Sequence, residues 1–331
     1  MFIIENYSIA VLFCIVTMLC WGSWANTQKL ANAGWRFELF YWDYVIGILL
    51  TSLLFAFTLG SSGEGGRSFL EDFHQADQGN INSALIGGLV FNIANILLVA
   101  AISIAGMSVA FPVGIGLALV VGVIVNYLDN PLGNSTLLFL GVALVVAAIL
   151  LNASAYRKMA SAASKVSTKG LALSVIAGLL MGLFYKYVAN SMFTDFTQPE
   201  AGKLSPYTAV VFFSIGIFLS NFIINTILMY KPFVGDPVSF GDYFKGTSKS
   251  HLMGILGGSI WCIGMSFSIL ASDKAGAAIS YGLGQGATII AAIWGIFIWK
   301  EFKDAPKGTS TLLNIMLLCY LVGLGMIIMA R

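Results

Sequence analysis

The chain has 331 residues, of which 58% are hydrophobic and only 10% charged, and its mean hydropathy is +0.88. This composition excludes a soluble globular protein of this length, because too little polar sequence remains to cover a water-exposed surface. The four cysteines show no CxxC or Cys/His spacing, so neither a disulfide framework nor a zinc site is indicated, and no cofactor is expected. We therefore predict an all-α integral membrane protein.

Ten apolar runs are long enough to span a bilayer core of about 30 Å, which takes roughly 20 residues of helix. The first run passes signal-peptide length without an A-x-A-like site, so we expect it to be retained as a helix. The predicted spans are residues 8–29, 37–59, 83–103, 107–128, 134–155, 169–192, 206–229, 251–272, 275–298 and 309–330.

Lysine and arginine divide unevenly between the two sides of this arrangement. We name the side that holds both termini side A and the opposite side, to which Lys29 at the end of the first span is assigned, side B. By the positive-inside rule side B is predicted to be cytoplasmic and the termini to lie outside, in a plasma or bacterial inner membrane. Side A holds Arg67, Lys203, Lys274 and Arg331, whereas side B holds Lys29, Arg36, Arg157, Lys158, Lys165, Lys169, Lys231, Lys245, Lys249, Lys300, Lys303 and Lys307.

The second half repeats a pattern of the first. A shift of 170 residues places "GGLVFNIANILLVAAISIAGMSVAFPVGIGLA", from Gly87, over "GGSIWCIGMSFSILASDKAGAAISYGLGQGAT", from Gly257, without a gap. Each half holds five predicted spans, and because five is odd the second half enters the membrane from the opposite side. Inverted repeats are typical of secondary transporters, which bind solute near the midplane. We predict a first five-helix repeat (1–155), a short cytoplasmic connector (156–168) and a second five-helix repeat (169–331).

Several motifs of the first half resemble a known family. "CWGSWANTQKL", "YWDY", "FTLG" and "GMSVAFPVGIGLALVVGVIVNYL" are similar to the ureide permease branch of the drug/metabolite transporter superfamily, close to the glucose/ribose and rhamnose uptake porters. The resemblance implies a ten-helix carrier that imports small polar solutes, often with protons. Plant members carry a nucleotide-binding-like sequence in a long central loop. The connector "YRKMASAASKVSTK" is short and lacks a glycine-rich phosphate cradle, so no ATP chemistry is expected.

Trp21, Trp24 and Gln28 lie at i, i+3 and i+7 and therefore share one face of the first predicted helix. Flat indoles beside an amide suit a neutral, ring-shaped solute that needs stacking and hydrogen bonds but no counter-charge. The alternative is an aromatic belt at the membrane interface, since these residues lie toward the cytoplasmic end of the helix.

Asn92 and Asn95 share a face of the third predicted span and are candidate solute contacts, or alternatively interhelical hydrogen-bonding groups. The repeat places Trp261 opposite Phe91, so the second half is expected to supply an aromatic wall.

In the ninth predicted span, "SYGLGQGAT" interleaves Tyr281 and Gln285 with three glycines. Such spacing favours close helix packing, or a helix loosened so that backbone groups face a cavity. Tyr281 and Gln285 share a face and are candidate solute contacts. Pro112, followed by two glycines, is the matching flexible point in the fourth span.

Two ionisable residues fall inside predicted spans. Asp43 lies about two turns into the second span, where removal from water favours the protonated carboxyl that a proton-coupling group needs; alternatively it stays hydrated, or pairs with Lys29 or Arg36. Lys186 in the sixth span either extends outward toward Asp195, or binds a carboxylate or carbonyl of the solute, or serves as a fixed cation.

These observations predict a secondary active transporter that imports a small neutral polar solute, a sugar or a ureide or purine-derived compound, by alternating access with proton coupling. An efflux permease of the same superfamily is the alternative. An intramembrane enzyme is not expected, because both histidines, His74 and His251, lie in a loop or at a helix edge and no GxSxG or HExxH motif occurs. The expected partners are the solute, a coupling proton and the lipid bilayer, without nucleic acid; the oligomeric state stays open.

Overall fold

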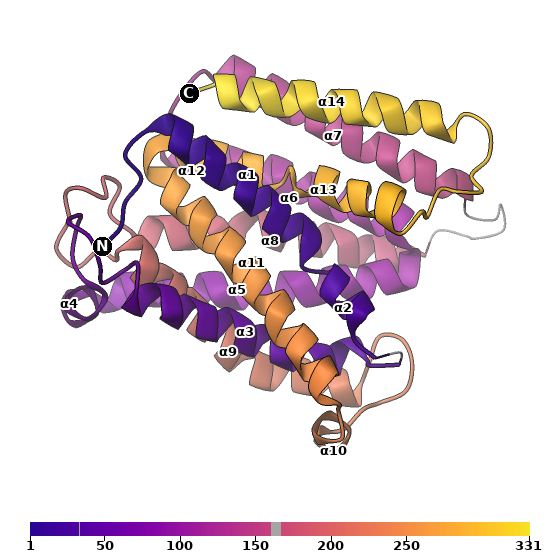
Figure 1. Cartoon of the computed structure of the whole chain (residues 1–331), viewed down its shortest axis with the longest axis horizontal. Coiled ribbons are helices and arrows are strands. Elements are labelled where there is room, and N and C mark those ends of the chain that lie inside the picture. Colours follow the sequence, from indigo (N-terminus) through magenta and orange to yellow (C-terminus); the bar gives the residue numbers. More distant parts are fainter. Residues whose placement is uncertain (33, 160–166) are drawn as a thin grey trace.

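The computed structural model describes residues 1–32, 34–159 and 167–331, and within these ranges the chain is helical without a β-strand (Figure 1). In the same ranges, nine helical segments are long and apolar enough to cross a membrane. Eight are single helices: α3 (Phe37–Phe57), α5 (Gln78–Ala105), α6 (Met107–Asp129), α7 (Ser135–Met159), α8 (Thr168–Ser191), α9 (Pro206–Tyr230), α11 (Ser248–Ala275) and α14 (Thr309–Met329).

The first predicted span is divided. α1 (Tyr7–Ser23) is an apolar helix of 17 residues, shorter than a full crossing, and α2 (Asn26–Leu30) follows after a turn. Polar side chains explain the division: the Asn26 amide donates to the Ser23 carbonyl (3.0 Å) and the Thr27 hydroxyl to the Trp24 carbonyl (2.8 Å). Such local bonds compete with the regular backbone ladder.

The ninth predicted span is also divided, into α12 (Ala277–Gly284), α13 (Ala287–Ile293) and the π-helix η1 (Trp294–Ile298). Its break at Gln285 and Gly286 lies beside the break in the first span, since a Cβ added to Gly22 would lie 2.5 Å from the Ala287 carbonyl oxygen. At Pro112, predicted as the matching flexible point, α6 is not divided but continues as one helix, although proline has no N–H for the backbone ladder.

The long helices pack into two bundles that each combine helices from both halves of the sequence. The first bundle consists of α5, α6, α8 and α9, with α8 packed chiefly against α5 and α6. The second bundle consists of α1, α2, α3, α11, α12 and α13, with α11 packed against both α1 and α3. Helices α7 and α14 lie against each other at one side of the molecule (Figure 1).

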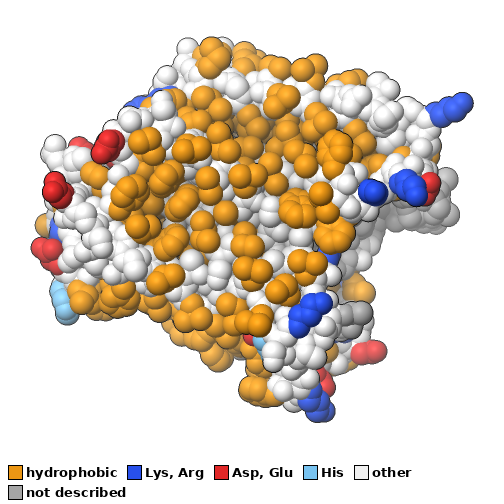
Figure 2. Space-filling view, viewed as in Figure 1, with side chains coloured by type: hydrophobic (Ala, Val, Ile, Leu, Met, Phe, Trp, Pro, Cys, Tyr) orange, Lys and Arg blue, Asp and Glu red, His pale blue; other side chains and the backbone are white. Residues whose placement is uncertain are grey.

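Both termini lie at the same end of the molecule, with the short helix α4 (Phe69–Gln75), whereas α2 and the short helix α10 (Phe240–Phe244) lie at the other end (Figure 1). Hydrophobic side chains cover the surface between the two ends, and most of the visible lysines and arginines gather at the end of α2 and α10 (Figure 2). This pattern fits a bilayer around the middle of the molecule. The chain is thus a multi-pass integral membrane protein.

Glycines bring the helices of each bundle into backbone contact. A Cβ added to Gly258 of α11 would lie 1.8 Å from the Tyr44 carbonyl oxygen of α3, and one added to Gly88 of α5 would lie 2.1 Å from the Phe213 carbonyl oxygen of α9. Helices in lipid associate through such close approach, because no hydrophobic effect drives them together there.

We predict that Gly258→Val lowers the free energy of unfolding by about 1 to 3 kcal/mol, because the new side chain pushes α3 away from α11. Thermal unfolding of the detergent-purified protein measures the change. Gly325→Val in α14 is the matched control, since no atom lies within 4 Å of a Cβ added there. Equal melting temperatures for the two variants would contradict the prediction.

Candidate functional site

A cavity of about 730 Å³ lies between the two bundles, with walls from α1, α2, α5, α6, α8, α11, the α12–α13 break and α13. Its deepest residues include Phe91 and Trp261 near the middle of α5 and α11 and Trp21 in the last turn of α1, and its lining continues to Asn32 and Gly34 beyond α2. The cavity therefore opens toward side B. Among its described lining residues only Lys29 is charged, and the polar ones are Gln28, Asn32, Asn95, Ser103, Gln285 and Thr288.

An aromatic wall closes the deep end of the cavity. The rings of Trp21 and Trp261 are stacked, with centroids 5.8 Å apart and planes inclined by 13°. The Trp21 indole N–H donates to the Trp261 carbonyl oxygen (3.2 Å), and this bond fixes the orientation of the Trp21 ring. The ring centroids of Phe91 and Trp261 are 4.3 Å apart. Trp24 lies nearer the mouth against Tyr44, with centroids 4.7 Å apart. All three predicted tryptophans thus line the cavity.

Four amide side chains line the same cavity, Gln28, Asn32, Asn95 and Gln285, and that of Asn32 at the mouth donates to the Thr247 hydroxyl (2.6 Å). Among the described residues, the side-chain amides of Gln28 and Gln285 have no hydrogen-bond partner, although Gln285 is only 7% exposed. Asn95 donates to the Tyr41 hydroxyl (3.2 Å). An amide offers both donors and acceptors, so these groups are equipped to bind a neutral polar molecule against the indole wall.

Asn92, one turn before Asn95, lies behind the wall. It is fully buried, accepts from the Tyr41 hydroxyl (2.9 Å) and donates to the Ser220 hydroxyl (2.9 Å), and it does not line the cavity. The alternative interpretation, an interhelical hydrogen-bonding group, describes its position.

The family can be assigned from the sequence of this scaffold. The model of the family described as Ureide permease matches residues 40–169 and 156–331, which together make up most of the chain. The chain belongs to the ureide permease family. As a member of that family it is a membrane transporter rather than an enzyme.

Two ureide permeases match this permease over nearly its whole length, and a glucose uptake protein matches a short part of it. "Ureide permease 1" of Arabidopsis thaliana is 25% identical over 99% of this chain and 98% of its own, and "Probable ureide permease A3" of Vigna unguiculata is 23% identical over 93% and 99%. "Probable glucose uptake protein GlcU" of Staphylococcus aureus (strain MRSA252) is 35% identical over only 22% of this chain and 26% of its own. A solved crystal structure covers 97% of the permease and 96% of its own chain with a TM-score of 0.62 at 13% identity, a likeness in fold alone.

Asp43 of the permease is buried behind the cavity mouth, beside two residues far away in sequence. Its carboxylate accepts from the Tyr243 hydroxyl (2.7 Å), and its second oxygen lies 2.9 Å from His251 Nδ1. The Asp43 side chain is 3% exposed and that of His251 25% exposed. The His251 ring packs edge-on against the cavity residue Trp35, with centroids 5.4 Å apart.

The two basic partners considered for Asp43 are engaged elsewhere. Lys29 pairs with Glu301 (3.0 Å) and Arg36 with Glu38 (2.7 Å). Burial and the neighbouring Asp43 carboxylate raise the pKa of the Tyr243 phenol on α10, so Tyr243 remains a donor to Asp43 at physiological pH. His251 and Tyr243 were not predicted as site residues, because 208 and 200 residues separate them from Asp43 and no local spacing links them.

Two other predicted contacts lie outside the cavity. Lys186 is at the side A end of α8, where it pairs with Asp129 (2.9 Å) of α6 rather than with Asp195. Tyr281 is fully buried one turn beyond Gln285, and its hydroxyl bonds to backbone carbonyls of the first bundle. The sequence does not predict Thr288 and Ser103, which also line the cavity. Thr288 follows Gln285 at i+3, and this helical spacing is the signal that could have placed it on the same face.

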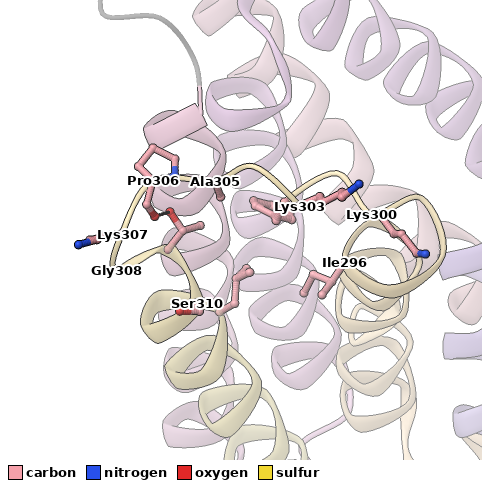
Figure 3. A pocket seen from close by; sticks show the side chains of 11 residues that line it. Ile296, Lys300, Lys303, Ala305, Pro306, Lys307, Gly308 and Ser310 are labelled. Atoms are coloured by element: carbon pink, nitrogen blue, oxygen red, sulfur yellow. Dashed lines mark hydrogen bonds between the residues drawn. The ribbon is translucent and has the colours of Figure 1, made fainter.

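A second, shallower pocket of about 420 Å³ lies at the loop between η1 and α14 on side B (Figure 3). Lys300, Lys303 and Lys307 line it, but the Lys307 amino group points away from those of Lys300 and Lys303 (Figure 3). Since the three charges do not converge on one point, this pocket is not built as an anion site. The central cavity is the candidate solute site.

We predict that replacing two buried amides has unequal effects on the stability of the ligand-free protein. Asn92→Leu removes the acceptor of the buried Tyr41 hydroxyl and a donor to the Ser220 hydroxyl, and should cost about 1 to 3 kcal/mol of unfolding free energy. Gln285→Leu removes an amide without a protein partner and should change stability little. Thermal unfolding without ligand compares the two, and a larger loss in Gln285→Leu would overturn the assignment of the free amide.

Proposed function

We propose that this permease imports a small neutral polar solute, a sugar or a ureide or purine-derived compound. The observation that supports this proposal is the cavity itself. Among the described residues, its lining combines a stacked indole wall with two unpartnered amides, and the one charged lining residue, Lys29, is paired with Glu301. Such a site offers stacking and hydrogen bonds without a counter-charge for an ionised solute. The names of its relatives, ureide permeases and a glucose uptake protein, refer to solutes of the same class.

Transport is proposed to follow alternating access, with two inverted five-helix repeats (1–155 and 169–331) joined by the 156–168 connector. Because each bundle takes helices from both repeats, the two bundles, rather than the two repeats, are the bodies proposed to rock around the solute. With side B in the cytoplasm and both termini outside, the open cavity corresponds to an inward-facing state in a plasma or bacterial inner membrane.

Asp43 with His251 is the proposed proton-coupling pair. The Asp43 carboxylate is buried, and the partly exposed His251 gives it a route to water on side B, the side to which the cavity opens. Among the described residues, no lysine or arginine is paired with Asp43. The carboxylate is therefore not held by a permanently charged partner, as a proton-coupling group requires.

We predict that one class of neutral solute stabilises the purified protein. A panel of monosaccharides, disaccharides, allantoin, uracil, xanthine and hypoxanthine is compared by thermal shift, where a ligand at 100 times its Kd adds about 2.7 kcal/mol. Gln285→Leu should reduce the shift, because it removes the free amide, whereas Gln198→Leu on the side A loop should not. A shift equal in all three proteins would contradict the proposed site, and accumulation of hydrophobic cations by everted vesicles would favour the efflux alternative.

We predict that Asp43→Asn and His251→Gln abolish accumulation of the stabilising compound against its gradient while preserving its exchange across the membrane. Exchange requires only the conformational cycle of the loaded carrier, whereas accumulation requires proton release. Uptake and counterflow in proteoliposomes with an imposed pH gradient measure the two processes. Asp195→Asn, which changes an exposed carboxylate on side A, is the control. Full accumulation by Asp43→Asn would exclude the coupling role.

A further inference from the structure

Just beyond the closed end of the cavity lie two tyrosines, Tyr185 and Tyr281, whose hydrogen bonds cross between the bundles in opposite directions. Tyr281 of the second bundle donates its hydroxyl to the carbonyl oxygens of Met181 (3.0 Å) and Ala118 (3.3 Å) in the first bundle. Tyr185 of the first bundle donates to the Ser268 carbonyl oxygen (3.0 Å) in the second. Each tyrosine therefore ties its own bundle to the backbone of the other.

The two rings form one continuous buried layer. Both tyrosines are completely buried and their ring centroids are 5.3 Å apart. The Ser280 hydroxyl lies 3.4 Å from that of Tyr185 and 3.1 Å from that of Ser268, which extends the layer along α12 and α11. Every hydroxyl in this layer has a hydrogen-bond partner, so the network stabilises the closed arrangement of the two bundles.

This layer lies on the side A end of the cavity. Tyr281 lies one turn nearer side A than Gln285, and Tyr185 follows the cavity residue Phe184 on a helix that runs toward side A. Met181 lines the cavity, and its carbonyl oxygen accepts from the Tyr281 hydroxyl. The tyrosine layer is therefore bonded directly to a cavity residue.

A glycine provides the slot for the Tyr281 ring. A Cβ added to Gly122 of α6 would lie 2.1 Å from an atom of that ring, so only glycine lets the ring reach the far backbone. The contact depends on shape as well as on hydrogen bonds.

We infer that Tyr185 and Tyr281 form the gate that closes the solute cavity toward side A. This inference rests on the proposed alternating-access function. Opening toward side A requires the bundles to separate at this layer, and each tyrosine then loses its bonds to the opposite backbone. The two residues position the bundles and are not themselves solute contacts.

The chain carries its own reporter for this gate. Cys14 is fully buried and its sulfur lies 3.7 Å from the Ser280 hydroxyl, within the layer, so it becomes accessible from side A only when the gate opens. With Cys20, Cys262 and Cys319 replaced by alanine, a membrane-impermeant maleimide is applied to right-side-out and everted vesicles, and labelling of an Arg331→Cys variant identifies which preparation exposes side A.

Tyr185→Phe/Tyr281→Phe should raise the labelling rate of Cys14 from side A on the order of tenfold, because both sets of cross-bundle bonds are lost. Each single variant should raise it about threefold, and Gly122→Val should raise it without removing a hydroxyl. Tyr320→Phe, a fully buried tyrosine of α14 outside both bundles, is the matched control and should leave the rate unchanged.

An unchanged Cys14 rate in folded single variants and in Gly122→Val would overturn the gate, as would increased labelling from side B alone. Folding is checked by monodisperse purification, and the single variants and Gly122→Val provide the test if the double variant does not purify. Labelling of Cys14 needs no solute, so it tests the gate separately from the solute site. If the gate inference is wrong, the labelling rates do not change but the ligand-induced thermal shift remains. If the solute assignment is wrong, the thermal shift is absent but the labelling rates still rise.

Discussion

Backbone hydrogen bonding in lipid is the constraint on which the arrangement of this permease depends, because a helix in hydrocarbon can be interrupted only where other groups replace its lost bonds. Two interruptions, between α1 and α2 and between α12 and α13, lie side by side at the cavity. Asn26 and Thr27 cap carbonyls at the first. The interruptions also place Gln28 and Gln285 at the cavity, where their amides have no partner within the described part of the chain. The same feature that weakens the helices therefore supplies polar groups of the site.

The charged residues of the membrane region are kept away from that site or neutralised beside it. Lys29 is paired with Glu301 at the cavity mouth, and Lys186 is paired with Asp129 at the opposite end of the molecule. Asp43 is paired with His251, whose ring packs against Trp35. The potential inside the cavity is therefore set mainly by amide, hydroxyl and indole dipoles. A cavity of this kind distinguishes neutral solutes by shape and hydrogen-bond pattern, since an ion entering it would lose its hydration without gaining an opposite charge.

The sequence predicts the long helices to within a few residues because hydropathy and bilayer thickness determine them together. It also predicts the three tryptophans and the amides of Gln28, Asn95 and Gln285 that line the cavity. It does not separate Asn92 from Asn95, because two residues one turn apart share a face and only the packing of α3 and α9 decides which one reaches the cavity. The partners of Asp43 depend on contacts between distant segments, which no periodicity reveals.

The division of each bundle between both halves of the chain has a consequence for biogenesis. The Thr17 hydroxyl of α1 bonds to the Gly264 carbonyl oxygen of α11, 247 residues later. During synthesis α1 therefore enters the membrane long before its permanent neighbour exists, and α5 and α6 likewise precede α8. The newly made first half exposes its small-residue packing faces to lipid until the second half emerges. Assembly is thus a late event that involves the whole chain, and truncated translation products lack a completed bundle to protect them from degradation.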